Sequence, residues 1–468
     1  MSSTIGTPDS TRLPAVLFVA LSLVTGVLYC VVTPPFQVPD EWNHFYRAWA
    51  ISEGQFQPIR HDGGVGFLLP PEIPALAESL AADVVFGQRR HVDPTRIRNA
   101  VDAAQAGEAR VFVNTPTTAY LTSLIYAPQA AGIALGRLFA LSPLQCLYLA
   151  RLMNLLVGTA LIAATLRVEP WRPWLLSLVA LAPMASSLRA SASPDVVTLG
   201  VAFWLIAKIA SLVLVRDAVA SRRDLLTILG GTALLCPMKI VYAPLALAAW
   251  LIPERAFVSR AAAWRFRLLQ ATIVVALGVC ASSRAASLWV PFRTDVATNP
   301  SEQFAIVLAD PIRFCALVAA DFLEFGPRYL AQMVGQLGWL AVNLPKPLVA
   351  IYVLVALVIW WLETRVVLEP RRWLIVAGLV ASSLLATSLS QYLIWTETGA
   401  QLIDGMQGRY LLPLVPLAAW LMPLRCPRTE HSRLLLPTLT IAIVLLATAV
   451  ALVEIVARYY PHGFELLL

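Results

Sequence analysis

Residues 13–32 read LPAVLFVALSLVTGVLYCVV and contain no charged side chain. An α-helix of this length rises about 30 Å, which matches the hydrocarbon core of a lipid bilayer. The stretch is longer than the apolar core of a signal peptide, and it lacks an A-x-A cleavage site. It therefore predicts a first membrane-spanning helix that stays in place.

The rest of the chain has the same apolar character. Of 468 residues, 58% are hydrophobic and 13% are charged, whereas soluble domains carry roughly 25% charged residues. The net charge is +7, but the arginines are scattered rather than gathered into a basic stripe, so we expect no nucleic-acid partner. The six cysteines show no CxxC spacing, which predicts neither a disulfide framework nor a zinc site. The composition predicts an all-α, polytopic integral membrane protein.

Eleven apolar segments are read as spans, within a range of ten to thirteen. They lie near residues 13–32, 143–166, 173–190, 195–215, 225–237, 240–253, 268–290, 346–362, 373–394, 410–424 and 434–457. Alternate connections are rich in arginine, namely 167–172, 216–224, 254–267, 363–372 and 425–433. Because Lys and Arg in short loops stay on the cytoplasmic side, this alternation predicts a cytoplasmic N-terminus.

The predicted architecture is one polytopic membrane domain over residues 13–458. It includes a large first extracytoplasmic loop at 33–142 and a second at 291–345, both expected to carry amphipathic interfacial helices. Residues 117–139 are apolar but are interrupted by Pro128 and glycines. An additional span there would move every later basic loop outside, so we expect this segment to lie in the interface or to re-enter the membrane.

The first loop opens with PPFQVPDEWNHFYRAW at residues 34–49. Pro39 and Asp40 are typical of a helix start. Continued as a helix, the sequence places charged and polar groups on one side and aromatic rings on the other. The polar side holds Asp40, Asn43, His44 and Arg47, with Glu41 at its border, and the aromatic side holds Trp42, Phe45, Tyr46 and Trp49. We expect the aromatic side to hold this helix at the outer membrane surface.

Three further charged residues stand at predicted span ends on the same side of the membrane. Asp195 opens a span, Lys239 lies at the break between two short apolar segments, and Arg409 follows a glycine at an outward end. A helix cap explains Asp195 equally well, and snorkelling to the interface explains Lys239 and Arg409. Together with Asp40 they predict a polar pocket at the outer ends of the spans, because charges at such depth are usually retained for function.

Several motifs resemble a family of predicted bacterial membrane proteins known as domain of unknown function 2142. The motifs are PPFQVPDEWNHFYRAWAISEG, the run at 114–137, YLARLMNLL, SASPDVVTLG, QMVGQLGWL and GRYLLPLVPL. That family is similar to the C-type (GT-C) glycosyltransferases, which use polyprenyl-phosphate-linked sugars and carry an acidic motif in the first external loop. The resemblance implies a GT-C-like fold in the bacterial inner (plasma) membrane, with Asp40 and neighbouring Glu41 in the place of the catalytic or metal-binding acid.

Such a reaction assigns a role to each candidate residue. Asp40 is the expected base for the acceptor hydroxyl, and Arg409, Lys239 and Arg47 are expected to bind the phosphate. His44 would orient a carboxylate or the acceptor. No cofactor is certain, but Asp40 and Asp195 are the expected ligands if a divalent cation is used.

The expected partners are a polyprenyl-phosphate-linked sugar, the bilayer, and a glycan, lipid or protein acceptor. Three alternatives to a transferase stay open. They are a flippase or transporter of lipid-linked glycans, a polysaccharide polymerase or ligase, and a non-catalytic membrane assembly protein.

Overall fold

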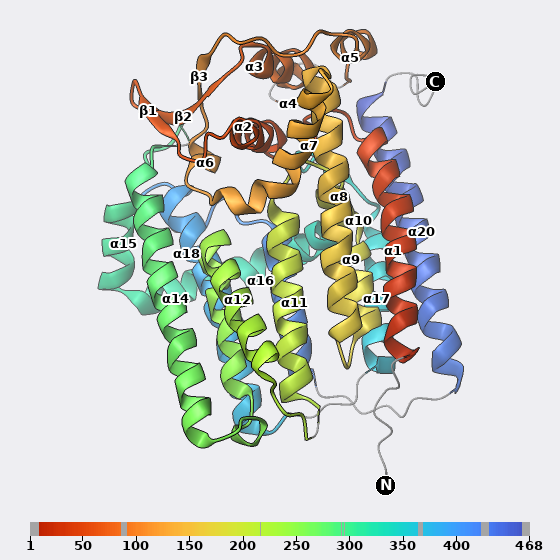
Figure 1. Ribbon diagram of the computed structural model, residues 1–468, viewed down its shortest axis with the longest axis vertical. Helices are drawn as coiled ribbons and strands as arrows, with labels where there is room; N and C mark the ends of the chain where they lie inside the picture. The colour runs from red at the N-terminus through yellow and green to blue at the C-terminus, as the bar shows by residue number, and fades with distance from the viewer. Residues whose placement is uncertain are drawn as a thin grey trace.

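The computed structural model describes residues 9–85, 91–215, 217–291, 293, 295–363, 368–422 and 430–460. Within these residues, seven helices are long and apolar enough to cross a membrane. They belong to α1 (Asp9–Val32), α8 (Pro143–Val168), α11 (Asp195–Val213), α14 (Arg260–Leu288), α17 (Lys346–Glu363), α18 (Pro370–Ile394) and α20 (Glu430–Tyr459). In Figure 1 these helices run side by side along the long axis of the molecule. The prediction of a polytopic helical membrane protein is confirmed.

The other four predicted spans form shorter or interrupted helices. Their elements are α9 (Pro173–Leu181) with α10 (Pro183–Arg189), then α12 (Arg222–Met238), then η3 (Ile240–Tyr242), α13 (Ala243–Ala246) and η4 (Leu247–Leu251), and finally η6 (Gly408–Leu414), α19 (Val415–Ala418) and η7 (Ala419–Leu421). Prolines such as Pro183, Pro244 and Pro413 explain the interruptions, because proline removes a backbone donor and clashes with the preceding turn. Three of the predicted basic connections, 216–224, 363–372 and 425–433, lie partly outside the described residues.

The segment from α12 to η4 is a helical hairpin. Ser221 caps α12 through a reciprocal pair of hydrogen bonds with Asp224, and the Ala220 N–H donates to the Ala256 carbonyl at 2.8 Å, which joins the two open ends. At the tip, Lys239 has extended backbone angles (φ −151°, ψ 104°). The break between the two short apolar segments therefore places Lys239 at the turn.

The described part of residues 33–142, predicted as the first external loop, folds over one end of the bundle, at the top of Figure 1. It contains α2 (Glu41–Ser52), α3 (Glu72–Ala77), the π-helical turn η1 (Glu78–Ala82), α4 (Asp83–Val85), α5 (Pro94–Val101), α6 (Pro116–Ala119), η2 (Ser123–Tyr126) and α7 (Ala127–Leu138). It also contains an antiparallel sheet, absent from the predicted elements, in the order β1 (Ile59–His61), β2 (Gly64–Leu69), β3 (Val111–Asn114). The sheet gives this loop an ordered scaffold.

Residues 117–139 do not form a spanning helix. The helix α7 has 12 residues, which is too short to cross about 30 Å of hydrocarbon. It packs closely along α8, where a Cβ on Gly132 would lie 2.6 Å from the Leu149 carbonyl oxygen. Gly132 therefore permits the close packing of α7 against α8.

The expectation that aromatic residues hold α2 at the membrane surface is wrong. Phe45 and Trp49 are fully buried in the protein core, and Tyr46 is also buried. Trp42 stacks on Trp339, with ring centroids 4.6 Å apart. The amphipathic pattern identified the apolar face correctly, but other elements of the same loop segment, above all α7, cover it in place of lipid.

The second external segment consists of α15 (Pro300–Ala309), α16 (Pro311–Gly335) and the short strands β4 (Gln336–Leu337) and β5 (Val342–Asn343). Apolar side chains of α16 such as Leu323 are exposed. Near its C-terminal end, Gln332 accepts a hydrogen bond from the Gly408 N–H at 2.7 Å. This segment therefore supports the residues that precede Arg409.

Candidate functional site

Asp40 and Arg409 form an ion pair although they lie 369 positions apart in the chain. The Arg409 Nη2 donates to the Asp40 Oδ2 at 3.1 Å. Asp40 immediately precedes α2 with φ 61° and ψ 10°, a left-handed conformation that is uncommon for residues other than glycine and is often found at functional sites. Its side chain is 35% exposed, against 4% for Arg409. The Asp40 carboxylate thus stays accessible while its cationic partner is buried.

The position of Asp40 is fixed by its neighbour Glu41, which is completely buried. Glu41 Oε1 accepts from Arg151 Nε at 2.8 Å and from the Ala192 N–H at 3.0 Å. Its Oε2 accepts from Arg151 Nη2 at 2.6 Å and from the Phe36 N–H at 2.9 Å. Both oxygens of Glu41 are therefore used inside the protein, away from any cavity.

Arg151 completes this buried pair from the α8 side. Its remaining donors reach the carbonyl oxygens of Cys30, Thr33 and Pro34 at 2.8–3.0 Å. One guanidinium thus connects the end of α1, the start of α2 and, through Glu41, the loop before α11. The sequence predicted Glu41 as a catalytic residue. In the structure its buried side chain instead holds the backbone next to Asp40.

Asp195 and Lys239 form a second ion pair beside the first. Lys239 Nζ lies 2.5 Å from Asp195 Oδ1, which connects the hairpin tip to the first turn of α11. The Lys239 ammonium lies 5.4 Å from the centre of the Tyr410 ring, and the Arg409 guanidinium lies 5.3 Å from the same centre. Both cations therefore contact the face of one tyrosine, which stabilises them through the ring quadrupole.

A cavity of about 270 Å³ lies among these groups, and its walls include Asp195, Lys239, Tyr242, Arg409 and Tyr410. Arg409 is buried. Its Nε and Nη1 have no hydrogen-bond partner among the described residues. Buried cationic donors without partners are costly, and a planar guanidinium matches the oxygens of a phosphate or carboxylate. The cavity therefore has the properties of an anion-binding site.

His44 contacts the same region from α2. Its Nδ1 lies 2.9 Å from the Tyr126 hydroxyl, and burial lowers the pKa of His44 to about 4, with Arg409 and Lys239 acting in the same direction against Asp40 and Asp195. The imidazole is neutral near pH 7 as a result. A neutral imidazole donates one hydrogen bond and accepts another, and it adds no further cation near Arg409 and Lys239.

Arg47 does not reach the cavity. Its guanidinium donates to the Phe56 carbonyl at 3.0 Å and to the Ser123 hydroxyl at 2.8 Å, and it lies 4.5 Å from the centre of the Phe67 ring. These contacts join α2 to the loop segments around it. The position of Arg47 does not fit the expected phosphate-binding role.

The donor set does not fit a metal ion. Within the described part of the chain, no group of three or more His, Cys, Asp or Glu residues gathers closely enough to hold one. Asp40 and Asp195, the two expected ligands, are each paired with a cationic side chain.

The structure adds tyrosines that the sequence did not single out. Tyr410 and Tyr242 line the cavity, and the Tyr242 hydroxyl donates to the Tyr410 carbonyl at 2.9 Å. Tyr410 follows Arg409 directly in GRYLLPLVP, which is a local signal. Tyr242 gave none, because tyrosines are common at membrane interfaces.

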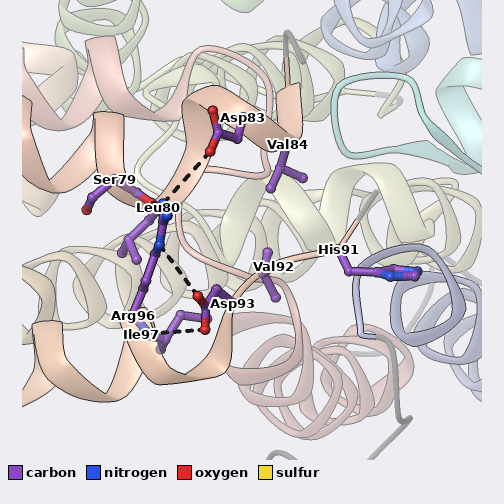
Figure 2. A pocket seen from close by; sticks show the side chains of 9 residues that line it. All are labelled: Ser79, Leu80, Asp83, Val84, His91, Val92, Asp93, Arg96 and Ile97. Atoms are coloured by element: carbon purple, nitrogen blue, oxygen red, sulfur yellow. Dashed lines mark hydrogen bonds and ion pairs between the residues drawn. The ribbon is translucent and has the colours of Figure 1, made fainter. Parts of the chain in front are cut away.

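A different cavity, of about 270 Å³, lies in the first external loop. Figure 2 shows Arg96 bridging Asp83 and Asp93 there, at 3.9 and 3.5 Å, while the His91 ring points away from them. These carboxylates are balanced by Arg96, so this cavity is a poorer candidate than the one at Arg409.

Comparisons with known proteins give three findings. A family model described as predicted membrane protein (DUF2142) matches residues 23–418. Among solved structures, ArnT from Cupriavidus metallidurans bound to undecaprenyl phosphate is similar with 14% sequence identity and a TM-score of 0.39, covering 94% of this chain and 74% of that chain. The search of curated proteins gives no significant match.

Proposed function

This chain belongs to the predicted membrane protein family DUF2142, and from its site we propose that it is a membrane glycosyltransferase. It moves a sugar from a polyprenyl-phosphate donor to an acceptor on the extracytoplasmic side of the bacterial inner membrane. The product belongs to cell-envelope glycan assembly or modification. The main support is the buried Arg409, which lines the cavity, has two donors without a partner among the described residues, and pairs with the accessible carboxylate of Asp40.

The proposed donor combines a charged group with a lipid tail. Its phosphate would bind the free Nε and Nη1 of Arg409, with Lys239 as a second cation, while Nη2 continues to hold Asp40. The Asp195 carboxylate, already paired with Lys239, would position that ammonium. Because the cavity lies at the N-terminal end of the spanning helix α11, the polyprenyl chain could remain in the bilayer.

The proposed reaction is a displacement at the anomeric carbon. The acceptor oxygen attacks this carbon, the bond from the carbon to the phosphate oxygen breaks, and polyprenyl phosphate leaves with the electron pair. Asp40 takes the proton of the acceptor hydroxyl. Arg409 stabilises the charge that develops on the leaving phosphate. Neutral His44 would orient the acceptor through its free ring nitrogen.

The test uses full-length purified protein in nanodiscs with radiolabelled undecaprenyl-phosphate sugars and candidate acceptors. We expect Asp40→Asn to lower transfer by about 100-fold or more, because a positioned base contributes that much. Asp102→Asn, an exposed carboxylate in the same external loop, is the matched control and should retain full transfer. Equal transfer by Asp40→Asn would contradict the assignment. Movement of a lipid-linked glycan across vesicles without any transfer would favour a flippase.

A second measurement does not depend on the acceptor. Undecaprenyl phosphate should raise the thermal unfolding midpoint of the wild-type protein by binding only the folded state. Arg409→Gln should abolish that increase, and the exposed Arg313→Gln should preserve it. The assignment of Arg409 to an anion-binding site would be wrong if undecaprenyl phosphate raised the unfolding midpoint of both variants as much as that of the wild type.

A further inference from the structure

A second cavity lies at the other end of α11. It is open to solvent, with about 320 Å³ of space when the solvent at its mouth is included, and Leu214, directly after the last residue of α11, is part of its wall. The first cavity begins at Asp195, the first residue of the same helix. The 19 residues of α11 rise about 28 Å, so the two cavities are separated by about one hydrocarbon thickness.

The cationic group in this second cavity is Arg172, which is 4% exposed. Its Nη2 makes one long hydrogen bond, 3.4 Å to the Met422 carbonyl. Nε and Nη1 of Arg172 have no partner among the described residues, and neither has the buried indole Nε1 of Trp171. Three buried donors at one cavity therefore require acceptors from a ligand or solvent.

A carboxylate lies beside these donors. Glu169 is 4% exposed, and its Oε1 accepts the backbone N–H groups of Trp171 at 3.1 Å and Arg172 at 3.4 Å. Burial raises the pKa of Glu169 to about 7. A cationic ligand group at this carboxylate would favour its ionised form.

Glu363 also acts electrostatically on Arg172, but its oxygens accept the Trp174 and Leu175 N–H groups at 2.9 and 2.8 Å. That carboxylate stabilises the start of α9 and is not part of the cavity wall. The cavity itself thus presents one cation with free donors and one carboxylate.

The remaining wall is apolar and includes Leu214, Pro416 and Trp420. Tryptophan is enriched at the level of lipid headgroups, where its ring contacts both acyl chains and polar groups. The location at the end of a spanning helix places this cavity at headgroup level in the leaflet opposite the Asp40 site.

We propose that this cavity binds the headgroup of a zwitterionic aminophospholipid. The phosphate accepts hydrogen bonds from Arg172 Nε and Nη1 and from the Trp171 indole, and the ammonium group pairs with Glu169. The first carbons of the acyl chains lie on Leu214 and Trp420. The site is separate from the Asp40 cavity, and it stands whether or not the protein transfers sugars.

The experiment measures lipid binding to the delipidated full-length protein in detergent by native mass spectrometry. The probes are phosphatidylethanolamine, phosphatidylglycerol, which has the phosphate but no amine, and inorganic phosphate. We expect phosphatidylethanolamine to bind most tightly. Arg172→Gln should weaken its binding about tenfold, which corresponds to the loss of about 1.4 kcal/mol from charge-assisted hydrogen bonds.

Controls separate this site from general attraction of lipid to basic residues. Arg167→Gln removes an exposed arginine near the same end of α8 and should leave binding unchanged. Glu169→Gln should reduce the preference for phosphatidylethanolamine over phosphatidylglycerol. Arg172→Lys keeps the charge but loses the planar set of donors, so this variant should also bind phosphatidylethanolamine weakly. It replaces Arg172→Gln in the experiment if that variant fails to fold.

Three results would overturn the proposal. One is equal binding of phosphatidylethanolamine to the wild type and to both Arg172 variants. Another is equal affinity for the two lipids in the wild-type protein. Inorganic phosphate that competes fully with phosphatidylethanolamine at equal concentration would assign the site to a free anion instead of a lipid.

Discussion

Asp40 and Glu41 are adjacent acidic residues with opposite surroundings. Asp40 pairs with Arg409, which lines the cavity, and keeps a third of its side chain exposed, whereas Glu41 has both oxygens occupied by Arg151 and backbone N–H groups. The left-handed backbone at Asp40 turns the two side chains to different sides. Glu41 therefore acts as a positioning residue for Asp40 in the proposed site.

Replacing Glu41 tests that assignment. Glu41→Gln should lower the free energy of unfolding by about 3–5 kcal/mol, because it leaves Arg151 as an uncompensated buried charge. Thermal unfolding of the detergent-solubilised protein measures the change. Glu108→Gln is a matched control in the same loop, since Glu108 is exposed and its replacement should cost at most about 1 kcal/mol. Similar losses for both variants would contradict this role.

At the scale of secondary-structure elements, the site depends on a close approach between α16 and the start of η6. A Cβ on Gly408 would lie 2.0 Å from the Tyr329 carbonyl oxygen, and the Gly408 N–H donates to Gln332. Because Arg409 is the next residue, this contact sets how deep its guanidinium lies beneath the external loop.

We therefore expect Gly408→Ala to move the segment that carries Arg409. The stability increase that undecaprenyl phosphate gives the wild-type protein should be lost or reduced in this variant, and its unfolding midpoint without ligand should fall. Gly326→Ala is the matched control within α16, because no atom lies within 4 Å of its added Cβ and alanine is the better helix former. An unchanged ligand response in Gly408→Ala would show that the close approach does not position Arg409.

For the whole molecule, the two ends of α11 define two sides. The first external loop and the Asp40 cavity lie at one end, and the arginine-rich connections lie at the other. The distribution of arginine predicts that the second side is cytoplasmic. The hairpin from α12 to η4 fits this arrangement, because both of its open ends meet on the arginine-rich side while Lys239 reaches Asp195.

Cysteine labelling tests this topology in a protein whose six natural cysteines have been replaced. A membrane-impermeant maleimide should label exposed Ala104→Cys in the external loop of intact spheroplasts. Exposed Ala261→Cys, near the start of α14, should react only after permeabilisation. Labelling of both positions from the same side would overturn the orientation.

The membrane class follows from the amino-acid sequence alone, and so do the positions of the apolar segments and the order of the charges along the chain. The sequence also predicts that Asp40, Asp195, Lys239 and Arg409 lie on the same side of the membrane. This prediction needs no knowledge of tertiary contacts, because hydrophobic length and arginine position are local properties. The structure then joins these four as two ion pairs, and Asp195, Lys239 and Arg409 line one cavity.

The cover of each helix face and the partner of each charge depend on how the chain folds. Helical periodicity shows that Phe45 and Trp49 share an apolar face, but protein and lipid are equally apolar covers for it. Glu41 meets Arg151 across 110 positions of the chain, and Arg47 meets Ser123 across 76. Such partners are chosen by the packing of distant segments, so no local pattern distinguishes Glu41 and Arg47 from the residues that reach the cavity.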